Sequence, residues 1–78
     1  MPTTQDIIAT IAERLALNPE DLERSANLRE DLNLNPIELN DLLSSLSQKF
    51  KISFEPEEVE RLEKVEDLVV LVEDNLID

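Results

Sequence analysis

The stretch Asn35-Pro36-Ile37-Glu38-Leu39 contains the clearest structural signal in this sequence of 78 residues. Asparagine is a preferred N-cap residue, and proline suits the first helical position because an N–H there has no partner inside the helix. A glutamate three residues after the cap can accept the backbone N–H of the cap residue in return. The stretch therefore predicts that a helix begins at Pro36.

The residues that follow this start carry apolar side chains at helical spacing, which predicts one buried helix face. The members of this face are Leu39, Leu42, Leu43, Leu46 and Phe50. Ile37 lies with Asp41 on the opposite, polar face of the same helix. We therefore expect Ile37 to be an exposed apolar side chain.

A first helix is predicted before this one, with Thr3 as its N-cap and Asp6 three residues later as the partner in a capping box. Its apolar stripe consists of Ile7, Ile8, Ile11 and Leu15. The segment 18–35 then loses helical periodicity but keeps spaced apolar residues, which predicts a long loop packed against the core. These residues are Leu22, Leu28, Leu32 and Leu34.

Two more helices are predicted in the second half of the chain: a short acidic helix from Pro56 to roughly Arg61, and a last helix from about Val65 to Leu76. Five consecutive apolar residues, 68–72, could also form a buried strand. The acidic residues on both sides and the lack of a second strand to pair with favour the helix. The predicted fold is all-α, a small four-helix bundle with three longer helices, a short third helix and a long first loop. We expect a single domain over residues 1–78.

Composition excludes several classes of function. The chain has 19 acidic against 7 basic residues, a net charge of −12, and no His, Cys or Gly. It therefore has no disulfides, no thiolate metal site and no glycine-rich phosphate loop. Nucleic acid is a repelled ligand, since binding to it depends on neutralising phosphates. No signal peptide or membrane span is visible, so we expect a cytoplasmic, monomeric protein that works by being bound.

A calcium loop is the first specific alternative. Asp31, Asn33 and Asn35 match the first three ligand positions of an EF-hand loop. Pro36, however, stands where the loop needs glycine, and Leu42 stands where it needs a bidentate glutamate. We therefore predict no metal site.

Catalysis is the second alternative. Serine and threonine are present, but no histidine is available to activate a hydroxyl. Carboxylates are abundant, yet acid–base catalysis needs two of them with separated pKa values, and a small bundle leaves nearly all of them solvated. The chain is predicted not to be an enzyme.

The segment 30–38 reads Glu-Asp-Leu-Asn-Leu-Asn-Pro-Ile-Glu. It resembles the pattern Glu-Asp-Leu-Gly-x-Asp-Ser-Leu-Asp of the acyl carrier proteins, the small acidic four-helix carriers of fatty-acid and polyketide synthesis. The family spacing of apolar residues in the next helix is matched by Leu42, Leu46 and Phe50. The resemblance continues without a gap from about Ile11 to the C-terminus, and it implies the same four-helix fold.

The resemblance also implies a prosthetic group that this chain is not built to hold. In the family, the serine at the start of the second helix is esterified with 4′-phosphopantetheine, whose thiol carries the acyl group. Pro36 occupies that position here and has no hydroxyl, so we predict no cofactor. Asn33 and Ala16 stand where carriers commonly have glycine. Val59 and Leu68 would fill the acyl cavity, although ordinary drift of core residues explains them equally well.

Acidic residues guide carrier proteins to their partners, and the resemblance therefore implies a partner protein with a basic docking face. The predicted contact residues are Ile37, Glu38, Asp41, Glu57, Glu58 and Glu60. Two functional hypotheses follow. The first is an acidic protein-interaction module of acyl-carrier type that lacks the attachment serine. The alternative is a drifted or engineered form of a working acyl carrier.

Overall fold

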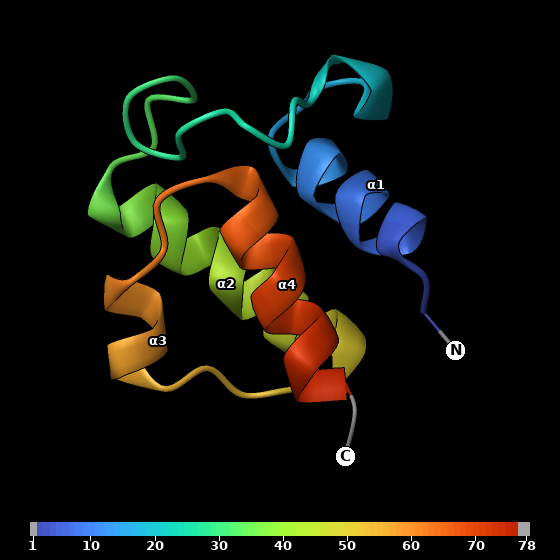
Figure 1. Ribbon diagram of the computed structural model, residues 1–78, viewed down its shortest axis with the longest axis vertical. Coiled ribbons are helices and arrows are strands. Elements are labelled where there is room, and N and C mark those ends of the chain that lie inside the picture. The colour runs from blue at the N-terminus through green and yellow to red at the C-terminus, as the bar shows by residue number, and fades with distance from the viewer. Residues whose placement is uncertain (1, 77–78) are drawn as a thin grey trace.

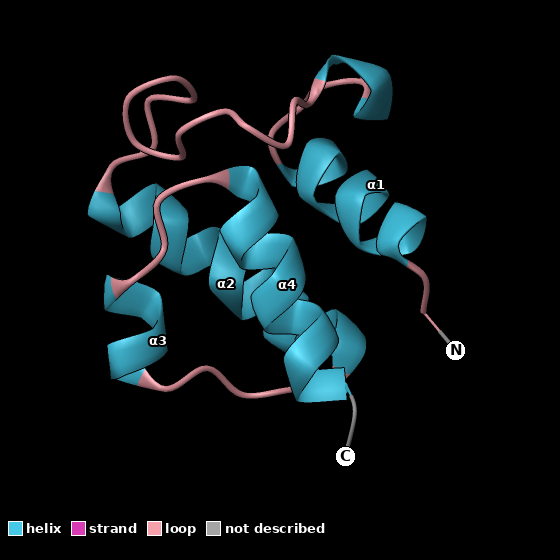
Figure 2. Ribbon diagram, viewed as in Figure 1, coloured by secondary structure: helices cyan, strands magenta, loops and turns pink. Residues whose placement is uncertain are grey.

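The computed structural model describes residues 2–76, and its regular elements are helical (Figures 1 and 2). The helices are α1 (Thr4–Arg14), α2 (Pro36–Phe50), α3 (Pro56–Glu60) and α4 (Val65–Leu76). A short 3-10 turn, Pro19–Asp21, lies in the long loop after α1. Within residues 2–76 no strand is formed, apart from one isolated bridge between Asn27 and Lys64. The all-α, four-helix prediction is confirmed.

Both predicted capping boxes form. The Thr3 hydroxyl accepts the N–H of Asp6 at 3.2 Å, and the Asp6 carboxylate accepts the N–H of Thr3 at 2.9 Å. At α2 the Asn35 side-chain oxygen accepts the N–H of Glu38 at 2.7 Å, and the Glu38 carboxylate accepts the N–H of Asn35 at 3.1 Å. Side-chain partners for these otherwise unpaired N–H groups determine where each helix begins.

The core lies where α1, α2 and α4 meet, and α4 crosses in front of α2 in Figure 1. α1 packs against both α2 and α4. The residues 68–72 are helical, so the strand alternative for this segment is wrong. Three of its residues, Leu68, Val69 and Val72, are fully buried, while Val70 faces solvent. This one-sided burial is what an amphipathic helix produces.

The long loop after α1 is fixed in place from both of its faces. Leu22, Leu28 and Leu34 insert into the core, as predicted. Backbone hydrogen bonds then tie the loop to the segment before α4 and to the first residue of α4. The N–H of Leu28 donates to the Glu63 carbonyl at 2.8 Å, and the N–H of Val65 donates to the Ala26 carbonyl at 3.0 Å. This anchoring holds the chain just before α2 in a defined position.

Left-handed backbone occurs at three residues that are not glycine: Ala16 (φ 58°), Asn33 (φ 56°) and Lys51 (φ 56°). Such a conformation costs a residue with a Cβ about 1–2 kcal/mol, and asparagine less than most. Ala16 and Asn33 are two positions at which the resemblance places glycine in carriers. The backbone at both positions has kept the conformation that glycine favours.

Candidate functional site

The start of α2 is the position at which the resemblance places the prosthetic group. Pro36 is the first residue of the helix and is exposed. Its side chain has no hydroxyl, and the side chain of Asn35 is engaged by the backbone of Glu38. The nearest hydroxyls along the helix are those of Ser44 and Ser45, two turns further on. The start of α2 therefore does not fit a phosphopantetheine ester.

Two of the residues that match the EF-hand pattern take part in hydrogen bonds with the backbone. The Asp31 carboxylate accepts the N–H of Asn27 at 2.7 Å, and the Asn35 side chain caps α2, so oxygens at two of the three matching positions already have protein partners. Within residues 2–76 no cluster of three or more acidic, His or Cys side chains is arranged to hold a metal ion.

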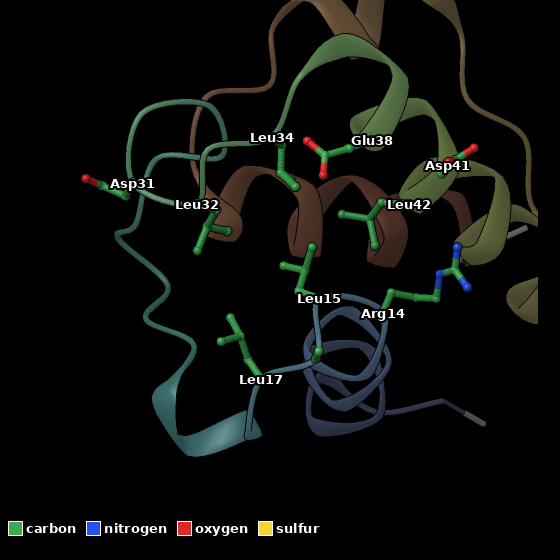
Figure 3. Close-up of a pocket in the computed structure, with 10 residues that line it drawn as sticks. Arg14, Leu15, Leu17, Asp31, Leu32, Leu34, Glu38, Asp41 and Leu42 are labelled. Carbon is green, nitrogen blue, oxygen red and sulfur yellow. The ribbon is translucent and has the colours of Figure 1, made fainter.

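The six predicted contact residues come from two helices, α2 and α3. Ile37 is 72 % exposed at the start of α2. Glu38 and Asp41 are exposed and line a groove of about 500 Å³ between α2 and the end of α1 (Figure 3). The other three residues, Glu57, Glu58 and Glu60, belong to α3, which borders a different hollow on α2.

The α3 acids differ among themselves in exposure. Glu57 and Glu60 are exposed, whereas Glu58 is half-buried. The Glu58 carboxylate accepts the N–H of Glu55 at 2.9 Å at the start of the short helix. Glu58 thus has a structural role in α3, while Glu57 and Glu60 face solvent.

The hollow between α2 and α3 measures about 370 Å³ and is open to solvent. Phe54 and Val59 line it from the α3 side, together with polar residues of α2 such as Ser47 and Gln48. Val59 is half-buried against the core, and Leu68 is fully buried. Leu68 therefore belongs to the core, whereas Val59 packs against the edge of the core.

Comparisons with known proteins match nearly the whole chain. The family model described as "Phosphopantetheine attachment site" matches residues 5–72. The acyl carrier protein of Wolinella succinogenes is 32% identical over 75 residues, which cover 96% of this chain and 99% of that protein. The acyl carrier protein of Chlamydia muridarum is 30% identical over 74 residues, covering 95% of this chain and 96% of that one.

A solved structure also resembles this fold. The acyl carrier protein of Thermotoga maritima superimposes with a TM-score of 0.73 at 24% identity, over 90% of this chain and 81% of that one. This structural likeness shows that the chain has the four-helix fold of a carrier protein. The chain belongs to the acyl carrier protein family. Proteins of this family are carriers and not enzymes, which confirms the prediction that the chain is not an enzyme.

The part of the chain that the structure describes contains no helix that is both long and apolar enough to span a bilayer. Sequence reasoning identified the acidic residues of α2 but missed the groove beside Glu38 and Asp41. Its walls come from three separate segments, 14–17, 31–34 and 38–42, which periodicity within one helix cannot bring together. The available signal was the leucines at 15, 32 and 34, which were interpreted as core residues alone, and Leu17, which was assigned no role.

Proposed function

We propose that this chain is an acidic protein-interaction module of the acyl carrier protein family that does not carry phosphopantetheine. The observation that carries this proposal is Pro36 at the first position of α2, where the register of the family pattern places the attachment serine. A proline side chain has no nucleophilic oxygen, so no phosphodiester can form there. The capping box around it keeps the helix start intact without a serine.

The partner that we infer is a protein with a basic docking face. The net charge of −12 attracts cations over a distance comparable to the Debye length, and exposed acids at Glu38, Asp41, Glu57 and Glu60 concentrate that charge beside α2 and α3. Ile37, 72 % exposed, supplies an apolar contact at the start of α2. We further propose that the protein is monomeric and cytoplasmic, because like-charged copies repel one another and the described helices offer no membrane span.

The test is capture of partners on the immobilised chain at about 50 mM and about 500 mM salt, between which the Debye length falls severalfold. We expect proteins retained at low salt to be released at high salt. Charge reversal at Asp41, Asp41→Lys, should reduce capture, and Asp74→Lys on the exposed side of α4 is the matched control. Retention that is equal for the wild type and Asp41→Lys would show that α2 is not the contact face.

The second candidate is a working carrier, and the match to curated acyl carrier proteins over nearly the whole chain favours it. It requires a hydroxyl that a phosphopantetheinyl transferase can modify, and Ser44 is the exposed serine nearest to Pro36 along α2. The mass of the intact chain after incubation with coenzyme A and a broad-specificity transferase separates the two candidates. A gain of one phosphopantetheine would establish the carrier and end the non-carrier proposal.

A further inference from the structure

The groove beside Glu38 and Asp41 has an apolar interior. Figure 3 shows leucine side chains from three segments converging on it: Leu15 and Leu17 from the segment just after α1, Leu32 and Leu34 from the loop before α2, and Leu42 from α2. Leu34 and Leu42 form its buried base, whereas Leu17 is 39% exposed. The groove is therefore a leucine-lined surface in which part of the apolar area still contacts water.

The open wall of this groove is held in place by the backbone. Ala16 takes a left-handed conformation at the end of α1, and the N–H of Leu17 donates to the Ala12 carbonyl at 2.8 Å. These features place Leu17 opposite the loop that carries Leu32 (Figure 3). A preformed wall reduces the ordering cost of binding, because little of the groove has to be rearranged.

The edges of the groove are charged. Glu38 and Asp41 lie three residues apart on α2, so they share one face with about 5–6 Å between their Cβ atoms. Arg14 lines the α1 side. Two neighbouring carboxylates favour cationic side chains of a partner, and a guanidinium next to an apolar floor favours an aromatic ring, through cation–π attraction.

We propose that this groove is a docking site for a basic amphipathic helix of a partner protein. The helix places one aromatic side chain among the leucines beside Arg14 and sets lysine or arginine side chains, one helical turn away, against Glu38 and Asp41. Helices bind apolar grooves in this way through residues three and four positions apart. The inference rests on the proposed function and specifies how that acidic surface recognises its partner.

Charge argues against the other obvious occupant, a second copy of this chain. Each copy has a net charge of −12, and the edge that a second copy would approach already contains Glu38 and Asp41. Bringing two such surfaces together is opposed by repulsion, whereas a basic helix is attracted to the same surface.

The probe for this proposal is a synthetic amphipathic peptide of about 18 residues with one tryptophan at the centre of its apolar face and lysines on either side of it. The protein contains no Trp and no Tyr, so the tryptophan emission of the mixture comes from the peptide alone. We expect a blue shift of this emission on binding, as the indole leaves water. A peptide with glutamine in place of the tryptophan is the control, with binding followed by backbone amide shifts in NMR spectra.

Two pairs of variants locate the bound peptide. Leu17→Gln should weaken binding about tenfold, which corresponds to the loss of one well-buried apolar contact, while Val70→Gln on α4 should change it less than about twofold. Asp41→Asn should weaken binding about threefold at low salt and less at high salt, with Asp74→Asn as its control. Leu17, Val70, Asp41 and Asp74 are all exposed, so these variants should fold, and their melting curves check this.

The outcomes separate this inference from the proposed function. Absence of binding, or equal effects of Leu17→Gln and Val70→Gln, overturns the groove as the docking site. If Leu17→Gln leaves peptide binding unchanged while Asp41→Asn and Glu57→Gln both weaken it, the groove is not the docking site. The acidic surface then remains the proposed partner site. If binding is insensitive both to salt and to these charge variants, recognition of a basic partner is itself wrong.

Discussion

The helices α2 and α3 have the same residue pattern at their N-termini but differ greatly in length and burial. Each starts at a proline that follows a polar residue, with a glutamate three residues after the cap. α2 continues for 15 residues and buries four leucines, whereas α3 stops after 5 residues and buries none fully. A helix start is thus specified locally, but the length and stability of the helix depend on the apolar face behind it. The start of α2 is thus capped without any contribution from the Pro36 side chain.

The largest predicted difference between α2 and α3 is the stability lost when an apolar side chain is truncated. Leu46 of α2 is fully buried, so Leu46→Ala should lower the free energy of unfolding by about 2–5 kcal/mol through lost burial and the cavity left behind. Val59 of α3 is half-buried, and Val59→Ala should cost about 1 kcal/mol or less. Urea denaturation measures both. Equal losses would contradict the view that α2 and not α3 is held by the core.

The ends of the two helices should respond in opposite directions to glycine. α2 ends at Lys51 in a left-handed conformation, with φ 56° and ψ 49°, so Lys51→Gly should raise the free energy of unfolding by about 1 kcal/mol. α3 ends at Arg61 in a right-handed conformation, and Arg61→Gly should lower it by about 0.5–1 kcal/mol. Thermal unfolding followed by circular dichroism distinguishes them. A loss of stability in both variants would show that the turn after α2 is not strained.

The N-cap residues of α2 and α3 should contribute different amounts to the free energy of unfolding. Asn35 accepts the N–H of Glu38 with its side chain, so Asn35→Ala should cost about 1 kcal/mol. At α3 the N–H of Glu58 donates to the main-chain carbonyl of Glu55 at 3.0 Å, which alanine preserves. Glu55→Ala should therefore change the stability by less than about 0.5 kcal/mol. A larger loss at Glu55 than at Asn35 would reverse this ranking of the caps.

The smallest predicted effect is a dependence of the folding stability on acidic pH, and it arises at the capping box of α1. Hydrogen bonds from the backbone and side chain of Thr3 hold the pKa of the Asp6 carboxyl below its ordinary value of 3.8. A lowered pKa stabilises the folded state above the unfolded-state value, and this contribution is lost as the pH falls through the folded-state value. The stability difference between the wild type and Asp6→Asn should thus be constant above about pH 5 and shrink below pH 3.8. Both proteins share the relief of net charge at low pH, so the difference isolates Asp6.

A stability difference between the wild type and Asp6→Asn that stays constant down to the lowest accessible pH would show that the hydrogen bonds with Thr3 do not lower the pKa of Asp6. Glu13→Gln, at an exposed position further along α1, provides the control for loss of one carboxylate.

The sequence predicted the helix starts at Thr4 and Pro36 because their signals lie within four residues and depend on specific side chains. It also placed α4, although five consecutive apolar residues allowed a strand until packing against α1 was known. It could not reveal the backbone bonds between the first loop and the segment before α4. These join residues such as Leu28 and Glu63, which are far apart in the chain.

The sequence also could not predict the direction in which individual side chains point. The acids of α2 and α3 were predicted to form one contact set. Glu38 and Asp41 line the groove on the α1 side of α2, whereas Glu58 of α3 lines a hollow that it shares with residues of α4. Their separation depends on how α2 is rotated in the bundle, and that rotation is set by the buried leucines together with neighbouring helices. The left-handed turn at Lys51 was not predicted either, because the residue there is not glycine.

We propose that the chain keeps the carrier fold at the start of α2 but lacks the hydroxyl needed to attach phosphopantetheine. The most direct test of this proposal is the intact mass of two proteins, the wild type and Pro36→Ser, after incubation with coenzyme A and a broad-specificity phosphopantetheinyl transferase. The capping box does not involve the Pro36 side chain, so Pro36→Ser should stay folded and lose no more than about 1 kcal/mol. We predict an unchanged mass for the wild type and a gain of one phosphopantetheine for Pro36→Ser. A gain of that mass by the wild type would contradict the account.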